Sequence, residues 1–221
     1  MVRLAQKEDL QAISAVHSAC FPNSYMTQLN NASLLGGGIL SDFYGFYYKD
    51  VPELFYVACD NDNNIVGFCM GYYMDKATQM QRFLKENKIK IAIVSLWLII
   101  KCNKIVWSKV LNRLRHKPGV TDWEIVNQKY EHITNEKRGD LLSVCVLPAY
   151  RGQGYAQQLM DAFLRALIQN DKILCLLSVK AENERARKYY ERNGFEVYRT
   201  RRGEGLTYIK PLTNGSNNVS T

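Results

Sequence analysis

The chain has 221 residues, of which 47% are hydrophobic and 23% charged, and a formal net charge of +8. This length and composition fit one soluble globular domain with a sizeable core, and they exclude a low-complexity chain. None of the six cysteines forms a C-x-x-C pair, and the first residues lack the apolar core of a signal peptide. We therefore expect a cytoplasmic protein with reduced thiols, no metal and no disulfide framework.

In the first 75 residues, the apolar pattern predicts a strand, two helices and a β-hairpin. Apolar residues recur at helical spacing in the first helix, which Pro22 ends. Aspartates and asparagines at 60–64 suit the turn between two strands rich in branched and aromatic residues. The expected elements are a strand at 2–5, helices at 7–20 and about 33–48, and strands at 54–59 and 65–74.

Residues 76–139 interrupt this order and carry the excess positive charge. They hold 14 Lys or Arg against 5 Asp or Glu, whereas the rest of the chain holds 15 against 16. A helical stretch at 80–87 precedes ten residues, 91–100, that are apolar except for Ser95. That run is too short to span a bilayer, which needs ~20 residues. An amphipathic helix follows and ends at Pro118-Gly119.

The second half of the chain alternates strands and helices, which indicates a layered α/β fold. Gly194 ends the second of these helices. The expected elements are strands at 141–147, 173–179, 195–200 and 206–209, and helices at 152–170 and 183–193. The tail at 213–221 is rich in Asn, Ser and Thr, and we expect it to be disordered.

The most informative stretch is 144–156, where a strand leads through a Pro-marked turn and a glycine-bearing loop into a helix. Such a loop directs unpaired backbone N–H groups at one point, and the helix dipole adds about half a positive charge there. Gly152 and Gly154 permit a close approach of the backbone. The pattern favours a diphosphate site, although the same turn also occurs for packing alone. Neither G-x-G-x-x-G nor G-K-[ST] is present.

The loop resembles the acyl-CoA signature of the GNAT superfamily, [QR]-x-x-G-x-[GA]. A second match lies downstream, where Asn183, Ala186, Tyr190, Gly194 and Phe195 resemble N-x-x-A-x-x-x-Y-x-x-x-G-F. The resemblance covers about 140–211, and the element order extends it to 1–75. It implies that the CoA pyrophosphate is bound, mostly through backbone, by Arg151, Gly152, Gln153, Gly154, Tyr155 and Ala156.

The resemblance also assigns roles around the thioester. Val144 and Val146 are expected to hold the pantetheine through the strand backbone. Asn183 can cap its helix, and Ala186 and Tyr190 share one helical face that can look toward the cofactor. By resemblance, Tyr190 is the catalytic acid that protonates the departing thiolate. The alternative is that Tyr190 only packs.

The fold implied is a single GNAT domain at 1–212. It has a mixed central sheet of about six to seven strands flanked by helices, and a largely helical insertion at about 76–139. Many relatives carry a glutamate base on the strand expected at 141–147, and this chain has none there. Candidates for the base are Asp140, Glu131, His132 and Asp75. Cys145 lies in an apolar strand, and we do not expect a covalent intermediate on it.

These features predict an acetyl-CoA-dependent N-acetyltransferase that transfers the acetyl group directly to a primary amine. The acceptor is a small molecule, such as an amino sugar or nucleotide-linked amino sugar, or a peptide N-terminus. Tyr72 and Tyr73 either line the acceptor pocket or form a plain strand-end pair. The alternatives are a non-catalytic acyl-CoA sensor or scaffold, and a membrane-docked enzyme that uses longer acyl chains.

The insertion leaves two interpretations open. Its apolar run and flanking lysines suit peripheral contact of 88–116 with an anionic membrane, at the inner membrane face. The other interpretation is a cover that completes the core or forms a homodimer interface. Nucleic acid is not expected as a partner, because the aromatic residues lie in the apolar run and not among the basic residues.

Overall fold

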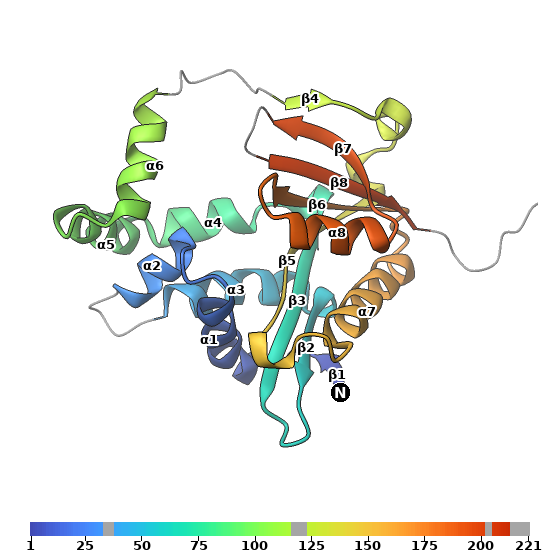
Figure 1. Cartoon of the computed structure of the whole chain (residues 1–221), viewed down its shortest axis with the longest axis horizontal. Helices are drawn as coiled ribbons and strands as arrows, with labels where there is room; N and C mark the ends of the chain where they lie inside the picture. The colour runs from blue at the N-terminus through green and yellow to red at the C-terminus, as the bar shows by residue number, and fades with distance from the viewer. Residues whose placement is uncertain (33–37, 116–122, 202–204, 213–221) are drawn as a thin grey trace, which may run out of the picture.

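The structure is a computed structural model that describes residues 1–32, 38–115, 123–201 and 205–212 (Figure 1). The expected helix end at Pro118-Gly119 and the expected disordered tail lie outside the described residues.

One mixed sheet forms the centre of the molecule, with the strand order β1-β2-β3-β5-β6-β8-β7-β4. All neighbouring strands pair antiparallel except β5 and β6, which are parallel. The strands are β1 (Val2–Leu4), β2 (Phe55–Cys59), β3 (Ile65–Tyr73), β4 (Trp123–Ile125), β5 (Arg138–Val146), β6 (Leu174–Lys180), β7 (Glu196–Arg201) and β8 (Gly205–Pro211).

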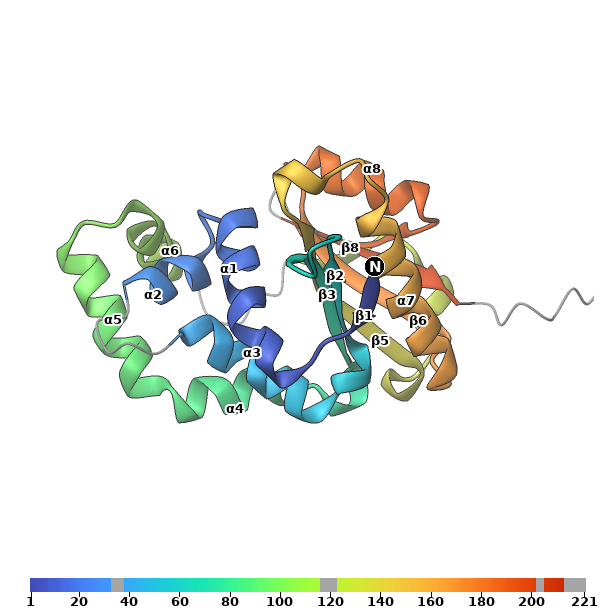
Figure 2. The same ribbon diagram turned by 90° about the horizontal axis from the view of Figure 1, so that it is seen from below.

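Helices cover both faces of the sheet, and Figure 2 shows α1 and α3 on one side and α7 on the other. The helices are α1 (Leu10–Cys20), α2 (Tyr25–Asn31), α3 (Ile39–Asp50), α4 (Gln79–Glu86), α5 (Lys88–Ile100), α6 (Lys104–Arg115), α7 (Tyr155–Gln169) and α8 (Glu184–Arg192). The layered mixed sheet is the fold expected from the sequence.

The core has two main parts, one on each face. On one face, α7 buries Leu159, Phe163 and Leu167, which recur every fourth residue, against the sheet. On the other face, Phe43 and Tyr44 of α3 pack edge-to-face with each other at a ring distance of 5.3 Å and join the core from α1 and β3. The sheet is therefore held rigidly from both sides.

Three features differ from the expectation. Helix α2 was missed, because its only sequence signal is Ser24, whose hydroxyl accepts a hydrogen bond from Thr27 N at 3.0 Å. Strand β5 begins at Arg138, not at 141. An eighth strand, β4, lies within the expected insertion and pairs with β7.

The helices of the expected insertion, α4 to α6, pack against the N-terminal helices. Val94, Leu98 and Val106 are buried in the same core as α1 and α3. Ser95, the one polar residue of the apolar run, hydrogen-bonds through its hydroxyl with the Tyr25 hydroxyl at 2.9 Å. One face of α5 therefore completes the core. Among the described residues, every helix is too short or too polar to cross a membrane.

Candidate active site

The pairing between β5 and β6 ends in the middle of the sheet. The last paired residues are Leu141 and Leu177, whereas β6 continues along β8 as far as Lys180. On its other side, β5 stays paired with β3 through Val146, with an irregularity in register between Ser143 and Leu141. The two halves of the sheet thus separate beyond Leu141, and no strand among the described residues pairs with that edge of β5.

The glycine loop sits at the open end of this separation. Gly152 and Gly154 have φ angles of +81° and +82°, which L-residues with a side chain rarely adopt. A Cβ at Gly152 would meet no atom within 4 Å, so the space above the loop is free. Helix α7 begins at Tyr155, and its first amides have no partner within the helix. The loop is therefore shaped to receive an anion.

Two long side chains of the loop form hydrogen bonds with nearby backbone carbonyl oxygens. Arg151 Nε donates to the Val146 carbonyl oxygen at 3.1 Å, and Gln153 Nε2 donates to the Ala149 carbonyl oxygen at 3.2 Å. These contacts turn both side chains back toward the strand end. The surface of the loop that remains available to an anion is therefore mainly backbone.

Helix α8 forms the opposite wall. Asn183 caps it as expected, since its Oδ1 accepts from the Ala186 amide at 3.2 Å. Tyr190 packs between Phe195 and Tyr208, at ring distances of 5.8 and 6.2 Å. Burial raises the pKa of the Tyr190 hydroxyl above its ordinary value, and that keeps the proton on the hydroxyl at neutral pH.

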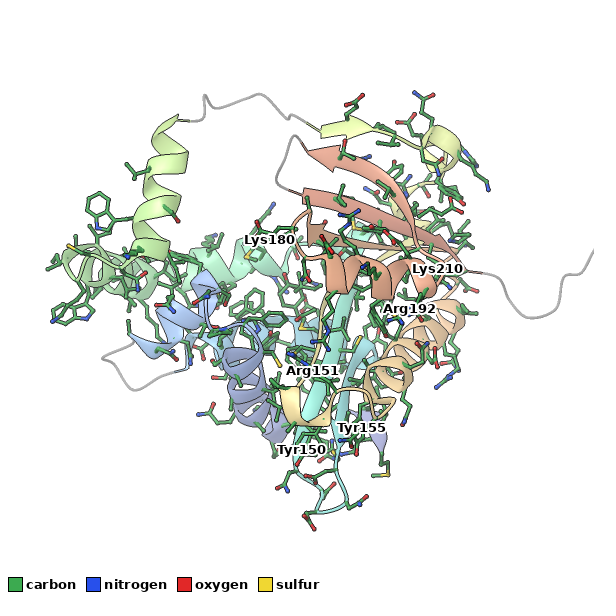
Figure 3. All side chains as sticks on the ribbon, viewed as in Figure 1. Tyr150, Arg151, Tyr155, Lys180, Arg192 and Lys210 are labelled. Carbon is green, nitrogen blue, oxygen red and sulfur yellow. The ribbon has the colours of Figure 1, made fainter. Side chains whose placement is uncertain are left out.

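Loop, β5 and α8 together enclose a cleft of about 470 Å³. All of the residues proposed for acetyl-CoA binding or for proton donation line it except Gln153, whereas the candidates for the base do not. The lining residues are Val144, Cys145, Val146, Tyr150, Arg151, Gly152, Gly154, Tyr155, Ala156, Gln157, Asn183, Arg185, Ala186, Tyr189, Tyr190 and Arg192. Figure 3 shows Arg151 and Tyr155 at the loop and Arg192 on α8.

The lining residues that the sequence motifs did not include are Tyr150, Gln157 and three residues of α8, namely Arg185, Tyr189 and Arg192. Arg185, Tyr189 and Arg192 follow each other at spacings of four and three, so they form one helical face, about 100° from that of Ala186 and Tyr190. Both faces border the cleft. That spacing was the available signal. The Tyr189 hydroxyl donates to the Ala156 carbonyl oxygen at 2.9 Å and thereby fixes α8 to the start of α7. The arginines give this end of the cleft a positive charge.

Cys145 also lines the cleft, but its chemistry is suppressed. Burial raises the pKa of its thiol well above the ordinary value. A thiol without thiolate character is a poor nucleophile, which agrees with a direct transfer.

Before the strands separate, β5 carries a carboxyl group that lies near two tyrosines. Asp140 pairs with Tyr72 of β3 and with Leu176 of β6, one residue before the β5–β6 pairing ends. Burial of the Asp140 carboxyl raises its pKa to about 7. Burial and then the nearby charge of Asp140 raise the pKa of Tyr47 to about 12 and that of Tyr72 further still. The rings of Tyr47 and Tyr72 lie 5.9 Å apart.

The other candidates for the base are placed differently. Asp75, Glu131 and His132 are exposed, and Asp75 forms an ion pair with Lys172 at 3.8 Å. Tyr73 points away from Asp140, because its hydroxyl donates to Glu53 Oε1 at 2.9 Å. Of the two strand-end tyrosines, only Tyr72 therefore lies beside Asp140.

A mixed sheet that separates beside a glycine loop, with α7 and α8 closing the gap, defines the GNAT class of fold. Residues 119–197 match the family described as Acetyltransferase (GNAT) domain. This part of the chain is similar in sequence to the GNAT acetyltransferases, and the fold is that of the same class. No curated protein matches the chain by sequence.

Solved structures with the same fold cover nearly the whole chain at low identity. A structure described as an acetyltransferase is 19% identical, with a TM-score of 0.58 and coverage of 96% of this chain and 100% of its own. Naa20 of Chaetomium thermophilum, in complex with a bisubstrate analogue, is 20% identical, with a TM-score of 0.52 and coverage of 96% and 86%. The ribosomal-protein-S18-alanine N-acetyltransferase of Escherichia coli is 12% identical, with a TM-score of 0.53 and coverage of 100% and 99%.

Proposed function

We propose that this protein is an acetyl-CoA-dependent N-acetyltransferase that acts on a primary amine. The observation that carries the proposal is the pair of protonatable groups at the point where the sheet separates. Tyr190 lies in the cleft with its proton retained, and Asp140 lies on the last paired stretch of β5 with a pKa of about 7. One group can give a proton and the other can take one.

The residues of the cleft fit acetyl-CoA as the cosubstrate. The amides of the loop and of the first turn of α7 suit a diphosphate, and the free edge of β5 at Val144 and Val146 suits the amide groups of a pantetheine arm. Bound acetyl-CoA supplies an activated thioester. Tyr190 is the residue placed to donate a proton to the sulfur that leaves.

Asp140 acts as the general base in this proposal. An amine reacts only after it loses a proton, and a carboxylate with a pKa of about 7 is partly ionised at neutral pH while still basic enough to accept that proton. The ordinary pKa of an aspartate, ~3.9, would make it a much weaker base. The burial of Asp140 therefore tunes it to this role.

We favour a peptide N-terminus as the acceptor. A peptide α-amine has a pKa of ~7.7–8.0, close to that of Asp140, whereas a lysine side chain at ~10.4 would lose its proton to Asp140 far less readily. The S18-alanine N-acetyltransferase, whose fold is similar, acts on an alanine of a ribosomal protein according to its name. Amino sugars form the second acceptor class.

The test is thiol release from acetyl-CoA by the purified protein, with peptides of different first residues, amino sugars, amino acids and polyamines as acceptors. We expect release with peptides and a strong loss in Tyr190→Phe. Release with amino sugars alone would overturn the acceptor, but not the enzyme. Saturable acetyl-CoA binding without release for any acceptor would favour the non-catalytic sensor.

A further inference from the structure

Helix α5 exposes a continuous apolar stripe on the side that faces away from the core. Its exposed residues after Lys88 are all apolar and recur at spacings of three and one, which place them on one helical face. They are Ile89, Ala92, Ile93, Leu96, Trp97 and Ile100. We call this set the α5 stripe. Its large side chains are 37% (Trp97) to 68% (Ile89) exposed, so they form a solvent-exposed apolar surface and are not part of the core.

The helix is fixed in this orientation by its other face. Val94 and Leu98 are buried in the core, and Lys90 forms an ion pair with Asp42 at 2.9 Å. Together with the hydrogen bond between Ser95 and Tyr25, these contacts prevent α5 from turning its stripe inward. The outward exposure is therefore built into the fold.

Helix α6 extends the apolar surface. Trp107 and Leu111 are exposed on it, and Trp107 Nε1 donates to the Ile99 carbonyl oxygen at 3.0 Å, which joins α6 to the end of α5. The indole thus lies next to the α5 stripe. Figures 1 and 2 both place α5 and α6 at the end of the molecule away from α7 and α8, so an object bound there would leave the cofactor cleft open.

The charged residues of α5 and α6 themselves have one sign. Residues 88–115 contain seven Lys or Arg and no Asp or Glu. Lys101 lies over the ring of Trp97 at 4.8 Å, and Lys104 is exposed at the start of α6. Lysines beside an apolar stripe can cover apolar surface with their methylene chains while their ammonium groups reach acidic groups around it.

We infer that the α5 stripe and its lysines are a docking surface for an anionic lipid bilayer. The helix has 13 residues and a length of about 20 Å, which suits a helix that lies in the interface plane. A second copy of the chain is disfavoured, because it would bring two basic surfaces of the same kind together. The charge complementarity selects an anionic partner, and the apolar stripe selects one with a hydrocarbon interior.

The experiment is co-sedimentation of the full chain with vesicles of phosphatidylcholine alone and of three parts phosphatidylcholine to one part phosphatidylserine, at low and high salt. We expect binding to the anionic vesicles that weakens at high salt. Each basic residue near an anionic surface strengthens binding about fivefold, so Lys101→Gln with Lys104→Gln is expected to weaken it about 25-fold.

The apolar contribution is tested by Ile93→Gln with Leu96→Gln. These side chains are 52% and 59% exposed, so their replacement leaves the core intact and is expected to weaken vesicle binding at least about tenfold. The matched control is Leu4→Gln with Ile173→Gln, which removes two exposed apolar side chains elsewhere and is expected to leave binding unchanged. Thermal unfolding and acetyl-CoA binding of all variants are measured to confirm that they are folded.

Three results would overturn the inference. The first is no binding to either vesicle, and the second is equal binding to both kinds of vesicle at both salt concentrations. The third is a dimer in analytical ultracentrifugation that the Ile93 and Leu96 variant dissociates, with no vesicle binding, because the stripe would then be an interface between copies. All three readouts are independent of the acetyl transfer reaction.

Discussion

Replacement of Asp140 by asparagine separates two expected consequences of its burial, namely the effect on stability and the ability to act as a general base. Asparagine keeps the shape of the side chain but can neither ionise nor accept a proton at neutral pH. Because burial raises the pKa of Asp140 from 3.8 to about 7, the folded protein binds this proton more tightly than the unfolded chain does. The stability that this provides is fully present below pH ~4, falls as the pH rises to ~7, and is lost above that.

A shift of this size corresponds to about 4 kcal/mol of stability lost on ionisation. We therefore expect Asp140→Asn to raise the free energy of unfolding by up to about 4 kcal/mol at pH 8, and to change it little at pH 4. The activity should move in the opposite direction. Removal of a general base is expected to lower kcat about a hundredfold or more.

The assay combines urea unfolding at pH 4 and pH 8 with the pH dependence of kcat/KM. The wild-type rate should rise with pH to a plateau above about 7, and that limb should be absent from the variant. Asp75→Asn is the matched control, because Asp75 is exposed. A variant that is less stable at pH 8 would refute the burial argument. A variant that keeps the wild-type rate and profile would refute the role as base.

Three further predictions concern the cleft. Tyr190→Phe should lower kcat about a hundredfold while calorimetry shows unchanged acetyl-CoA affinity, because only the donated proton is removed; an equal loss of affinity would instead indicate a packing role. Gly154→Ala should lower the free energy of unfolding by about 1–2 kcal/mol, because its φ of +82° disfavours a side chain, and it should weaken acetyl-CoA binding. Gly45→Ala within α3 is the control. It should not destabilise the protein, because the new Cβ would come no closer than 3.8 Å to Leu10. The double variant Arg185→Gln with Arg192→Gln should raise KM for acetyl-CoA about tenfold and reduce the dependence of KM on salt. The control is Lys188→Gln, because Lys188 lies outside the cleft and forms an ion pair with Glu184 at 3.9 Å. This control should leave KM unchanged.

The second half of the fold was predictable because its signals are local. The stripe of α7, the Asn183 cap and the glycine loop each lie within a few residues of the structure that they specify. The same holds for the cleft, since its expected lining residues occur in two short motifs. Their roles toward acetyl-CoA remain predictions.

The missed features depend on residues far apart in the sequence. Strand β4 has three residues and forms only because it pairs with β7, more than 70 positions later. The Asp140 carboxyl is unremarkable in the sequence, and its raised pKa results from the protein atoms that bury it beside Tyr47 and Tyr72. Such properties arise from tertiary packing, to which periodicity and spacing give no access.

The pairing of β4 with β7 gives residues 76–139 a second role. Ile125 and Trp123 occupy the outer edge of β7 opposite Arg199 and Arg201, and the Val126 amide donates to the Tyr198 carbonyl oxygen at 2.9 Å. A chain that lacks residues 123–125 would leave that backbone edge open to strands of other molecules, which is a common route to aggregation. A chain that loses only α4 to α6 would keep its edge covered. Residues 123–126 thus protect the edge strand β7 from pairing with other molecules.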